Sequence, residues 1–133
     1  MKKILLTLGI IALTLSCNTP QNTTMNTPQG PFYHIVFFWM NHPDSLEEQQ
    51  QLRSELERFM DKIPQPISKH IGTPAGTPRE VVDNSYQFSL VLNFESKESQ
   101  DAYQIDPIHL EFIDRAQHLW KKVQVYDSYA TKE

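Results

Sequence analysis

Phe32-Tyr-His-Ile-Val-Phe-Phe-Trp-Met40 is the segment from which the fold follows. It is short, rich in β-branched and aromatic residues, and apolar on both alternating sides except at His34. Successive side chains of a strand point to opposite faces of a sheet, so this strand must be covered from both faces. We expect helices over the face that carries His34, Val36 and Phe38, and a second layer over the other face. The face of Ile35 and Phe37 is the alternative for the helices, because the sequence alone does not separate the two.

Two helices and three further strands are predicted after this segment. Ser45 and Glu48 form a capping box for a helix that runs to about Ile63. Strands are predicted over residues 67–72, 86–94 and 122–126, and Ser96 begins the second helix. The order βαββαβ is that of a ferredoxin-like α+β fold, with both helices on one face of an antiparallel sheet. The first helix buries one apolar stripe: Leu52, Leu56, Phe59, Met60 and Ile63.

The uncovered face of the sheet predicts a homodimer. Two copies that pack through this face would form a dimeric α/β barrel. The barrel interior would be partly polar, because it would be lined by Gln87, Ser89 and Asn93. A monomer would instead expose an apolar row consisting of Ile35, Phe37 and Trp39.

The second helix is interrupted by Tyr103-Gln-Ile-Asp-Pro-Ile-His109. Pro107 cannot continue a helix, because it lacks the N–H and its ring collides with the carbonyl of Tyr103. Asp106 and Pro107 suit an N-cap followed by the first position of a new helix. In an unbroken helix Tyr103 and His109 would point to separate sides, whereas the break allows both to face the sheet.

We expect His34, Tyr103 and His109 to converge between the sheet and the helices. His109 heads an apolar stripe with Phe112, Ile113, Ala116 and Trp120, and burial near a helix N-terminus keeps its imidazole neutral. These three residues are the candidate catalytic group, with His109 as general base and the other two orienting an oxygen. The predicted ligand pocket is lined by Val36, Phe38, Leu56, Leu90, Leu92 and Phe112.

Two other interpretations of these residues remain. His109 can be a buried histidine that bonds to Tyr103 or His34 and pins the broken helix, with Asp106 simply its cap. The second is a metal site built from His34, His109 and a carboxylate, which the lack of closely spaced ligands such as H-E-x-x-H disfavours. No metal and no cofactor are therefore expected. A Tyr103–His109 hydrogen bond beside a cavity of roughly 300 Å³ or more would favour binding or catalysis. A space filled by apolar side chains would favour a purely structural role.

The N-terminus predicts export and a lipid anchor. Met1-Lys-Lys precedes an apolar run from Ile4 to Ser16 that is shorter than the roughly 20 residues needed to span a bilayer. This pattern is typical of a secretory signal peptide over residues 1–16. Thr14-Leu-Ser-Cys17 resembles the lipobox of bacterial lipoproteins, which implies lipidation of Cys17 and a membrane anchor. The alternative is a secreted or periplasmic protein.

The domain boundaries follow from composition. Residues 17–30 are expected to be the lipidated cysteine and a disordered tether, residues 31–130 the folded domain, and residues 131–133 a tail. Cys17 is the only cysteine, so no disulfide can form within one chain. The formal net charge is −4 and becomes more negative once Lys2 and Lys3 are removed, which argues against nucleic acid as a partner.

Residues 32–129 resemble the Dabb, or stress-responsive A/B barrel, family of small dimeric ferredoxin-like proteins. The matching segments are His34-Ile-Val-Phe, Gly72, Phe88 to Phe94 with Glu95-Ser96, and Tyr103 to His109 with Phe112. The family motif is Tyr-x-x-His-Pro-x-His, so Asp106 replaces its first histidine. In a plant polyketide cyclase of the family, residues that match His34, Tyr103 and His109 surround the substrate. A tyrosine on the first helix of that enzyme corresponds to Leu56.

We therefore predict an envelope-anchored, homodimeric barrel that binds a small apolar molecule or serves a stress-linked role. The first alternative is a cyclase-like or lyase-like enzyme with His109 as base, and the second is a purely structural interaction module. The outer membrane is favoured, because Asn18 is not the aspartate associated with inner-membrane retention.

Overall fold

The computed structural model describes residues 29–131. The elements are β1 (Phe32–Met40), α1 (Leu46–Lys62), β2 (Ser68–Gly72), β3 (Phe88–Phe94), α2 (Lys97–Gln104), α3 (Pro107–Ala116), the 3-10 turn η1 (Gln117–Leu119) and β4 (Trp120–Tyr129). The predicted signal peptide, Cys17 and nearly all of the tether lie outside the described residues. Within residues 29–131 no helix has the length and apolar character that crossing a membrane requires.

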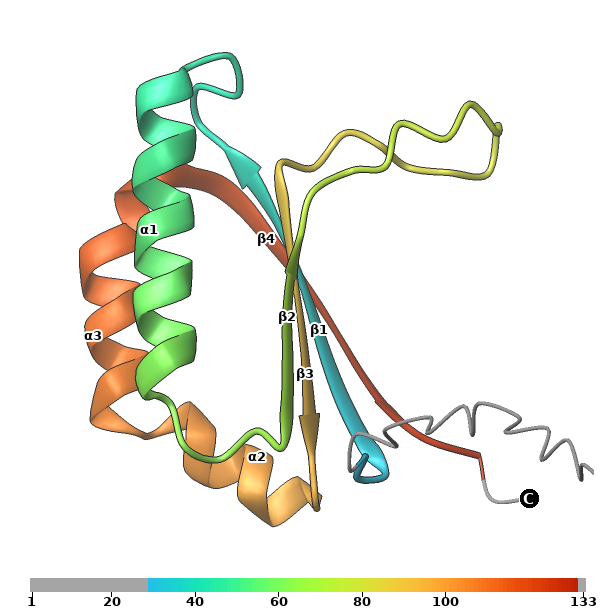
Figure 1. The fold of residues 1–133 in the computed structure, drawn as a ribbon, viewed down its shortest axis with the longest axis vertical. Coiled ribbons are helices and arrows are strands. Elements are labelled where there is room, and N and C mark those ends of the chain that lie inside the picture. The colour runs from blue at the N-terminus through green and yellow to red at the C-terminus, as the bar shows by residue number, and fades with distance from the viewer. Residues whose placement is uncertain (1–28, 132–133) are drawn as a thin grey trace, which may run out of the picture.

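The four strands form one antiparallel sheet in the order β2-β3-β1-β4. The helices lie on one face of this sheet, and no helix of residues 29–131 covers the opposite face, on whose side the loop between β2 and β3 projects (Figure 1). This is the ferredoxin-like α+β arrangement, and the predicted fold class is confirmed.

β1 presents alternate residues to the helices and to the open face. Phe32, His34, Val36, Phe38 and Met40 are buried, while the residues between them are half-buried. The register pairs His34 with Leu92 and Val36 with Leu90, so the apolar side of β3 shares the helix face. Placing His34, Val36 and Phe38 under the helices is therefore correct.

The N-terminus of α1 forms only half of the predicted capping box. The Ser45 hydroxyl accepts a hydrogen bond from the Glu48 backbone N–H at 3.3 Å. The Glu48 carboxylate binds His42 Nδ1 at 2.9 Å instead of returning to the Ser45 backbone, whose N–H donates to the carbonyl of His42. The buried stripe of α1 is as predicted.

Several predicted boundaries were wrong. β3 begins at Phe88 rather than Tyr86, and β4 runs from Trp120 to Tyr129 rather than over residues 122–126. α3 ends at Ala116, so Trp120 does not extend the helical stripe of His109 but begins β4. Trp120 still packs against Phe112, with ring centroids 5.8 Å apart.

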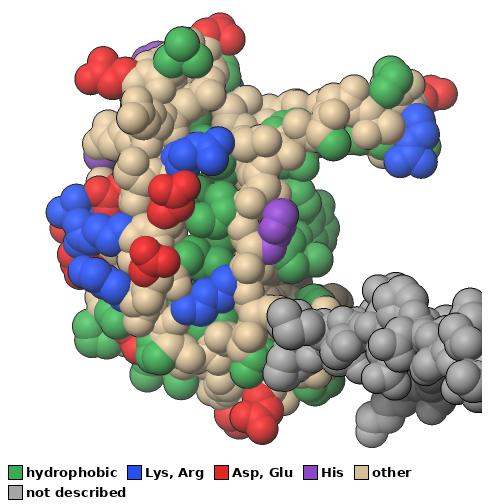
Figure 2. Space-filling view, viewed as in Figure 1, with side chains coloured by type: hydrophobic (Ala, Val, Ile, Leu, Met, Phe, Trp, Pro, Cys, Tyr) green, Lys and Arg blue, Asp and Glu red, His purple; other side chains and the backbone are tan. Residues whose placement is uncertain are grey.

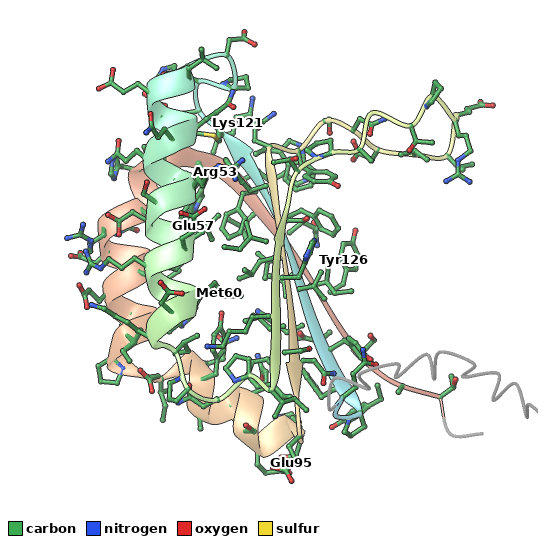
Figure 3. The ribbon with its side chains drawn as sticks, viewed as in Figure 1. Arg53, Glu57, Met60, Glu95, Lys121 and Tyr126 are labelled. Carbon is green, nitrogen blue, oxygen red and sulfur yellow. The ribbon has the colours of Figure 1, made fainter. Side chains whose placement is uncertain are left out.

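The open face of the sheet is aromatic. Figure 2 shows charged side chains over the helical layer and hydrophobic ones on the other side of the sheet, and in Figure 3 Tyr126 projects away from the helices. Phe37 contacts the ring of Tyr126 edge-on, at 6.2 Å between centroids. A hollow of about 370 Å³ on this face is lined by Phe37, Trp39, Asp83, Tyr86 and Tyr126.

The Asn93 side chain is not available to bind water inside a barrel. Its side-chain amide hydrogen-bonds to the backbone of Gly30 and Phe32, and the residue is almost fully buried. The amide therefore fastens the segment before β1 to β3. Gln87 is similarly engaged, since its side-chain oxygen accepts from the backbone N–H of Met40 at 2.9 Å.

Candidate functional site

The predicted break in the second helix is present. α2 ends at Gln104, and α3 begins with Pro107 at its first position. Asp106 is the N-cap, and its Oδ1 accepts a hydrogen bond from the backbone N–H of Ile108 at 2.8 Å. The break places Tyr103 and His109 side by side, with ring centroids 4.5 Å apart and planes inclined by 35°.

A cavity of about 200 Å³ lies between this break and the sheet. Three rings on three different elements contribute polar atoms to its wall: His34 on β1, Tyr103 on α2 and His109 on α3. The remaining walls are mainly aromatic and aliphatic, and are made by Val36, Phe38, Leu90, Gln104, Phe112, Ile113, Trp120, Val123 and Val125.

The structure brings together the three candidate catalytic residues and four of the six predicted pocket residues. Leu56 and Leu92 are fully buried in the core and do not line the cavity. Phe38, Leu90 and Phe112 border the space rather than fill it. The cavity is smaller than the roughly 300 Å³ at which typical ligand pockets begin, so it suits a molecule about the size of one aromatic ring.

Tyr103 is 2% exposed and is surrounded by aromatic rings. Its hydroxyl forms no hydrogen bond with another residue in the stretch 29–131. Among the fully buried side-chain oxygen and nitrogen atoms of that stretch, the one without a hydrogen-bond partner is Gln65 Oε1. The Tyr103 oxygen also has no partner, so it is not fully buried and can reach the cavity. Burial, followed by the Asp127 carboxylate, raises the pKa of Tyr103, which keeps the phenol protonated and able to donate.

His109 is half-buried, and its Nδ1 lies 3.1 Å from the backbone carbonyl of Gln104. A carbonyl only accepts, so Nδ1 carries the proton and Nε2 keeps its lone pair. Burial is the main cause that lowers the pKa of His109, so the ring is neutral at pH 7. The alternative in which His109 bonds to Tyr103 or His34 is not found within residues 29–131: Nδ1 bonds to the Gln104 carbonyl, and the imidazole packs against the Tyr103 ring.

His34 has a partner that the sequence analysis missed. Its Nδ1 lies 2.6 Å from Oδ1 of Asp127, and the two residues are direct neighbours across β1 and β4. The His34 side chain is 5% exposed, whereas that of Asp127 is 45% exposed. Asp127 therefore orients the imidazole from the solvent side of the cavity. A correct register for the last strand would have revealed this pair.

The three rings offer complementary hydrogen-bonding groups to one small molecule. Tyr103 donates from its hydroxyl, and His109 accepts at Nε2. His34 uses Nδ1 for Asp127, so Nε2 is the atom of that ring left for a ligand. The arrangement can hold one oxygen of a ligand and accept a proton from an adjacent atom.

Residues 29–131 contain no group of three or more His, Cys, Asp or Glu side chains placed to hold a metal ion. His34 and His109 approach the same cavity, and the carboxylate nearest to His34, that of Asp127, is already bound to its ring.

These features define a class of protein: a single ferredoxin-like domain with an open aromatic sheet face and a small cavity under a broken helix. The Stress responsive A/B Barrel Domain (Dabb) family model matches residues 32–130. The chain belongs to the Dabb family. No curated protein matches it.

Solved structures share this fold. The hydroxynitrile lyase of Passiflora edulis is 19% identical, with a TM-score of 0.66 over 80% of this chain and 98% of that one. A Dabb family protein of Mesorhizobium loti is 18% identical, with a TM-score of 0.64 over 78% and 100%. A protein of unknown function from Bacteroides fragilis, described as dimeric, is 17% identical, with a TM-score of 0.61 over 77% and 98%. At these identities the likeness concerns the fold alone.

Proposed function

We propose that this chain is an envelope-anchored homodimeric Dabb protein that binds a small, largely apolar molecule between its sheet and its helices. The observation that carries the proposal is the cavity of about 200 Å³, apolar over most of its wall and bordered by His34, Tyr103 and His109. An apolar cavity of this size holds a ring-sized molecule, and three polar atoms at one end fix its orientation.

The homodimer is supported by the open face of the sheet. Phe37, Trp39 and Tyr126 form a partly exposed aromatic surface there, and Tyr126 is 57% exposed. Contiguous apolar surface of this kind marks a protein interface. The fold relatives described as dimeric are consistent with a second copy on this face.

The anchor is supported by the sequence Thr14-Leu-Ser-Cys17 alone. The wild-type chain should sediment with membranes, and its mature N-terminal peptide should carry acyl chains on Cys17. The Cys17→Ser chain should remain in the soluble fraction. An unmodified wild-type Cys17, or equal solubility of the two chains, would remove this part of the proposal.

Native mass spectrometry of the full chain carrying Cys17→Ser tests dimerisation and binding together. The proposal predicts a mass of two chains, plus a small organic molecule that is lost when collisional energy is raised. Tyr103→Leu is the matched variant, since it should stay dimeric but lose the added mass. A dimer that never retains any molecule, alone or with phenol added, would leave a purely structural interaction module as the function.

A second candidate function is proton abstraction beside a carbonyl, which the state of His109 favours. Its lowered pKa and its occupied Nδ1 leave a neutral imidazole with a free Nε2 lone pair. In this reaction Nε2 takes a proton from the carbon next to the carbonyl, and the C–H electron pair forms an enolate. The Tyr103 hydroxyl donates a hydrogen bond to the negative oxygen, and the His34 ring borders the same site.

Solvent exchange tests this reaction without knowledge of the natural substrate. Acetophenone in D₂O should exchange its methyl protons faster with the Cys17→Ser chain than with the same chain carrying His109→Gln. Proton NMR of the methyl signal measures the rate. Equal rates for the two proteins would reject His109 as a base for such ketones and leave binding as the function.

A further inference from the structure

The turn between α2 and α3 is held by more bonds than a helix cap needs. Asp106 Oδ1 caps α3 through Ile108, while Oδ2 accepts a second hydrogen bond, from Gln65 Nε2, at 2.7 Å. The backbone N–H of Asp106 donates to the carbonyl of Tyr103, and its own carbonyl accepts from Leu110. One residue thus joins the end of α2, the start of α3 and the loop between α1 and β2.

Gln65 is fixed on its side of this contact. It lies between Pro64 and Pro66, whose rings restrict the backbone on both sides. Its Oε1 is buried and has no hydrogen-bond partner within residues 29–131. A buried carbonyl without a partner is unfavourable, so the amide orientation is set by the bond that Nε2 makes to Asp106.

Asp106 itself does not line the cavity, whereas Tyr103 and His109, three residues to either side, do. The two rings can lie 4.5 Å apart only while α2 and α3 keep their present angle. Gln65 comes from a different part of the chain, so its bond fixes that angle relative to the rest of the domain. The same bond is the main cause that lowers the pKa of Asp106 and keeps the carboxylate ionised as an acceptor.

We propose that Gln65 and Asp106 are positioning residues, and that their hydrogen bond holds His109 against Tyr103 in the binding geometry. This inference rests on the proposed function, because it assigns the pair to the same cavity. Neither residue touches a ligand in this account, and both act through the turn. Aspartate in place of the family's histidine supplies a second acceptor oxygen for Gln65 while the first one caps α3.

Four substitutions distinguish the effect of the Gln65–Asp106 hydrogen bond from the effect of the Asp106 charge. Gln65→Ala removes the bond but keeps the cap and the carboxylate. Asp106→Ala removes all three. Asp106→Asn removes the charge but lets the Gln65 amide rotate, so that its unpartnered Oε1 accepts from the new carboxamide. Gln49→Ala is the control, because it deletes another glutamine bond, from Gln49 Nε2 to the carbonyl of Pro43 at 2.6 Å, away from the cavity.

The pKa of His109 depends on the charged and polar groups that face its ring. Asp106 lies on the same turn and raises its pKa, while His34 on β1 lowers it. Asp127 on β4 stands behind His34, and Tyr103 stays protonated. Losing the charge at position 106 should therefore lower the pKa of His109 in both Asp106 variants, whether or not the ring moves.

Histidine-ring NMR of the full chain carrying Cys17→Ser provides the test. The His109 Hε1 signal carries ring-current shifts from Tyr103 and from Phe59, whose ring lies 5.8 Å away. Gln65→Ala should remove at least half of this offset and weaken phenol binding about fivefold, the equivalent of one hydrogen bond. Asp106→Asn should retain the offset, whereas Asp106→Ala should lose it.

Two results would overturn the proposal. One is a His109 Hε1 chemical shift that is the same in Gln65→Ala as in the control Gln49→Ala. The other is an offset lost equally in Asp106→Asn and Asp106→Ala, which would make the charge rather than the bond responsible. The His109 signal is measured without ligand, so it tests the positioning pair separately from phenol binding, whose absence in the unsubstituted chain would refute the cavity's function.

Discussion

Tyr103→Phe should leave stability almost unchanged while impairing binding. The substitution deletes one oxygen and keeps the ring, which packs against His109 at 4.5 Å, Phe94 at 5.3 Å and His34 at 5.6 Å between centroids. Deleting a tyrosine hydroxyl that is hydrogen-bonded within the protein costs about 0.5–1.5 kcal/mol. The Tyr103 hydroxyl has no such bond within residues 29–131, so the expected change in the free energy of unfolding is below about 0.5 kcal/mol.

The matched control is Tyr103→Ala, which removes the ring as well. A side chain that is 2% exposed and packed among four rings should cost about 3–5 kcal/mol on truncation. Urea unfolding, followed by the fluorescence of Trp39 and Trp120, measures both free energies. Phenol binding should weaken about tenfold in Tyr103→Phe, because the ligand loses one hydrogen bond between neutral groups.

A loss of more than about 1 kcal/mol in Tyr103→Phe would refute the reasoning. It would mean that the hydroxyl is bonded within the folded protein, and hence that Tyr103 is part of the packing rather than a donor aimed at a ligand. Unchanged phenol affinity in a fully stable variant would equally contradict the role assigned to the hydroxyl.

Three further predictions concern other parts of the molecule. Phe37→Asp places a charge on the open sheet face and should convert the dimer to a monomer in native mass spectrometry, with the mutation Leu110→Asp on an exposed helix position as a control that stays dimeric. His109→Gln should change the pH dependence of stability, because burial lowers the pKa of His109 in the folded state. The wild type should lose stability relative to the variant as pH falls below about 6.5, the ordinary pKa of histidine. Above about pH 7.5, urea titrations should show a constant difference in unfolding free energy between the two proteins. Phe112→Leu should cost about 1–1.5 kcal/mol and enlarge the cavity, so 4-ethylphenol should gain affinity relative to phenol; an unchanged preference would show that Phe112 does not limit the ligand.

The fold was predictable because its determinants are local. The alternation of β1, the stripe of α1 and the proline at position 107 each constrain the backbone within a few residues. Pro107 was the most informative of these, since one ring both ends α2 and begins α3. Which face of β1 lies under the helices could not be decided from the sequence, because both faces are apolar; the structure shows that it is the face of His34, Val36 and Phe38.

The finer features of the site depend on contacts between distant segments. The His34–Asp127 pair joins residues 93 positions apart and requires the register between β1 and β4. The contact of Asn93 with Gly30 joins residues 63 positions apart. A polar side chain often has several possible hydrogen-bond partners of similar energy. Glu48, for example, binds His42 rather than the Ser45 backbone. Sequence periodicity carries no information about these choices.

Cavity size was also beyond the sequence. Leu56 and Leu92 are apolar residues on the helix side of the sheet, but they lie in the fully packed core. Val123 and Val125 reach the cavity because they are the neighbours of Phe38 and Val36 across β1 and β4 and so share the helix face. The volume depends on how a dozen side chains pack, and a displacement of one methylene group alters it.

Histidine-ring NMR during a phenol titration tests the central claim most directly. The Cys17→Ser chain contains His34 and His109 at the cavity, and His70 and His118 outside it, as internal references. The account predicts that phenol shifts the ring signals of His34 and His109 in a saturable manner, leaves His70 and His118 in place, and binds more tightly than benzene. Equal shifts for His34, His109, His70 and His118, or shifts that never saturate, would contradict the existence of a ligand site beneath the broken helix.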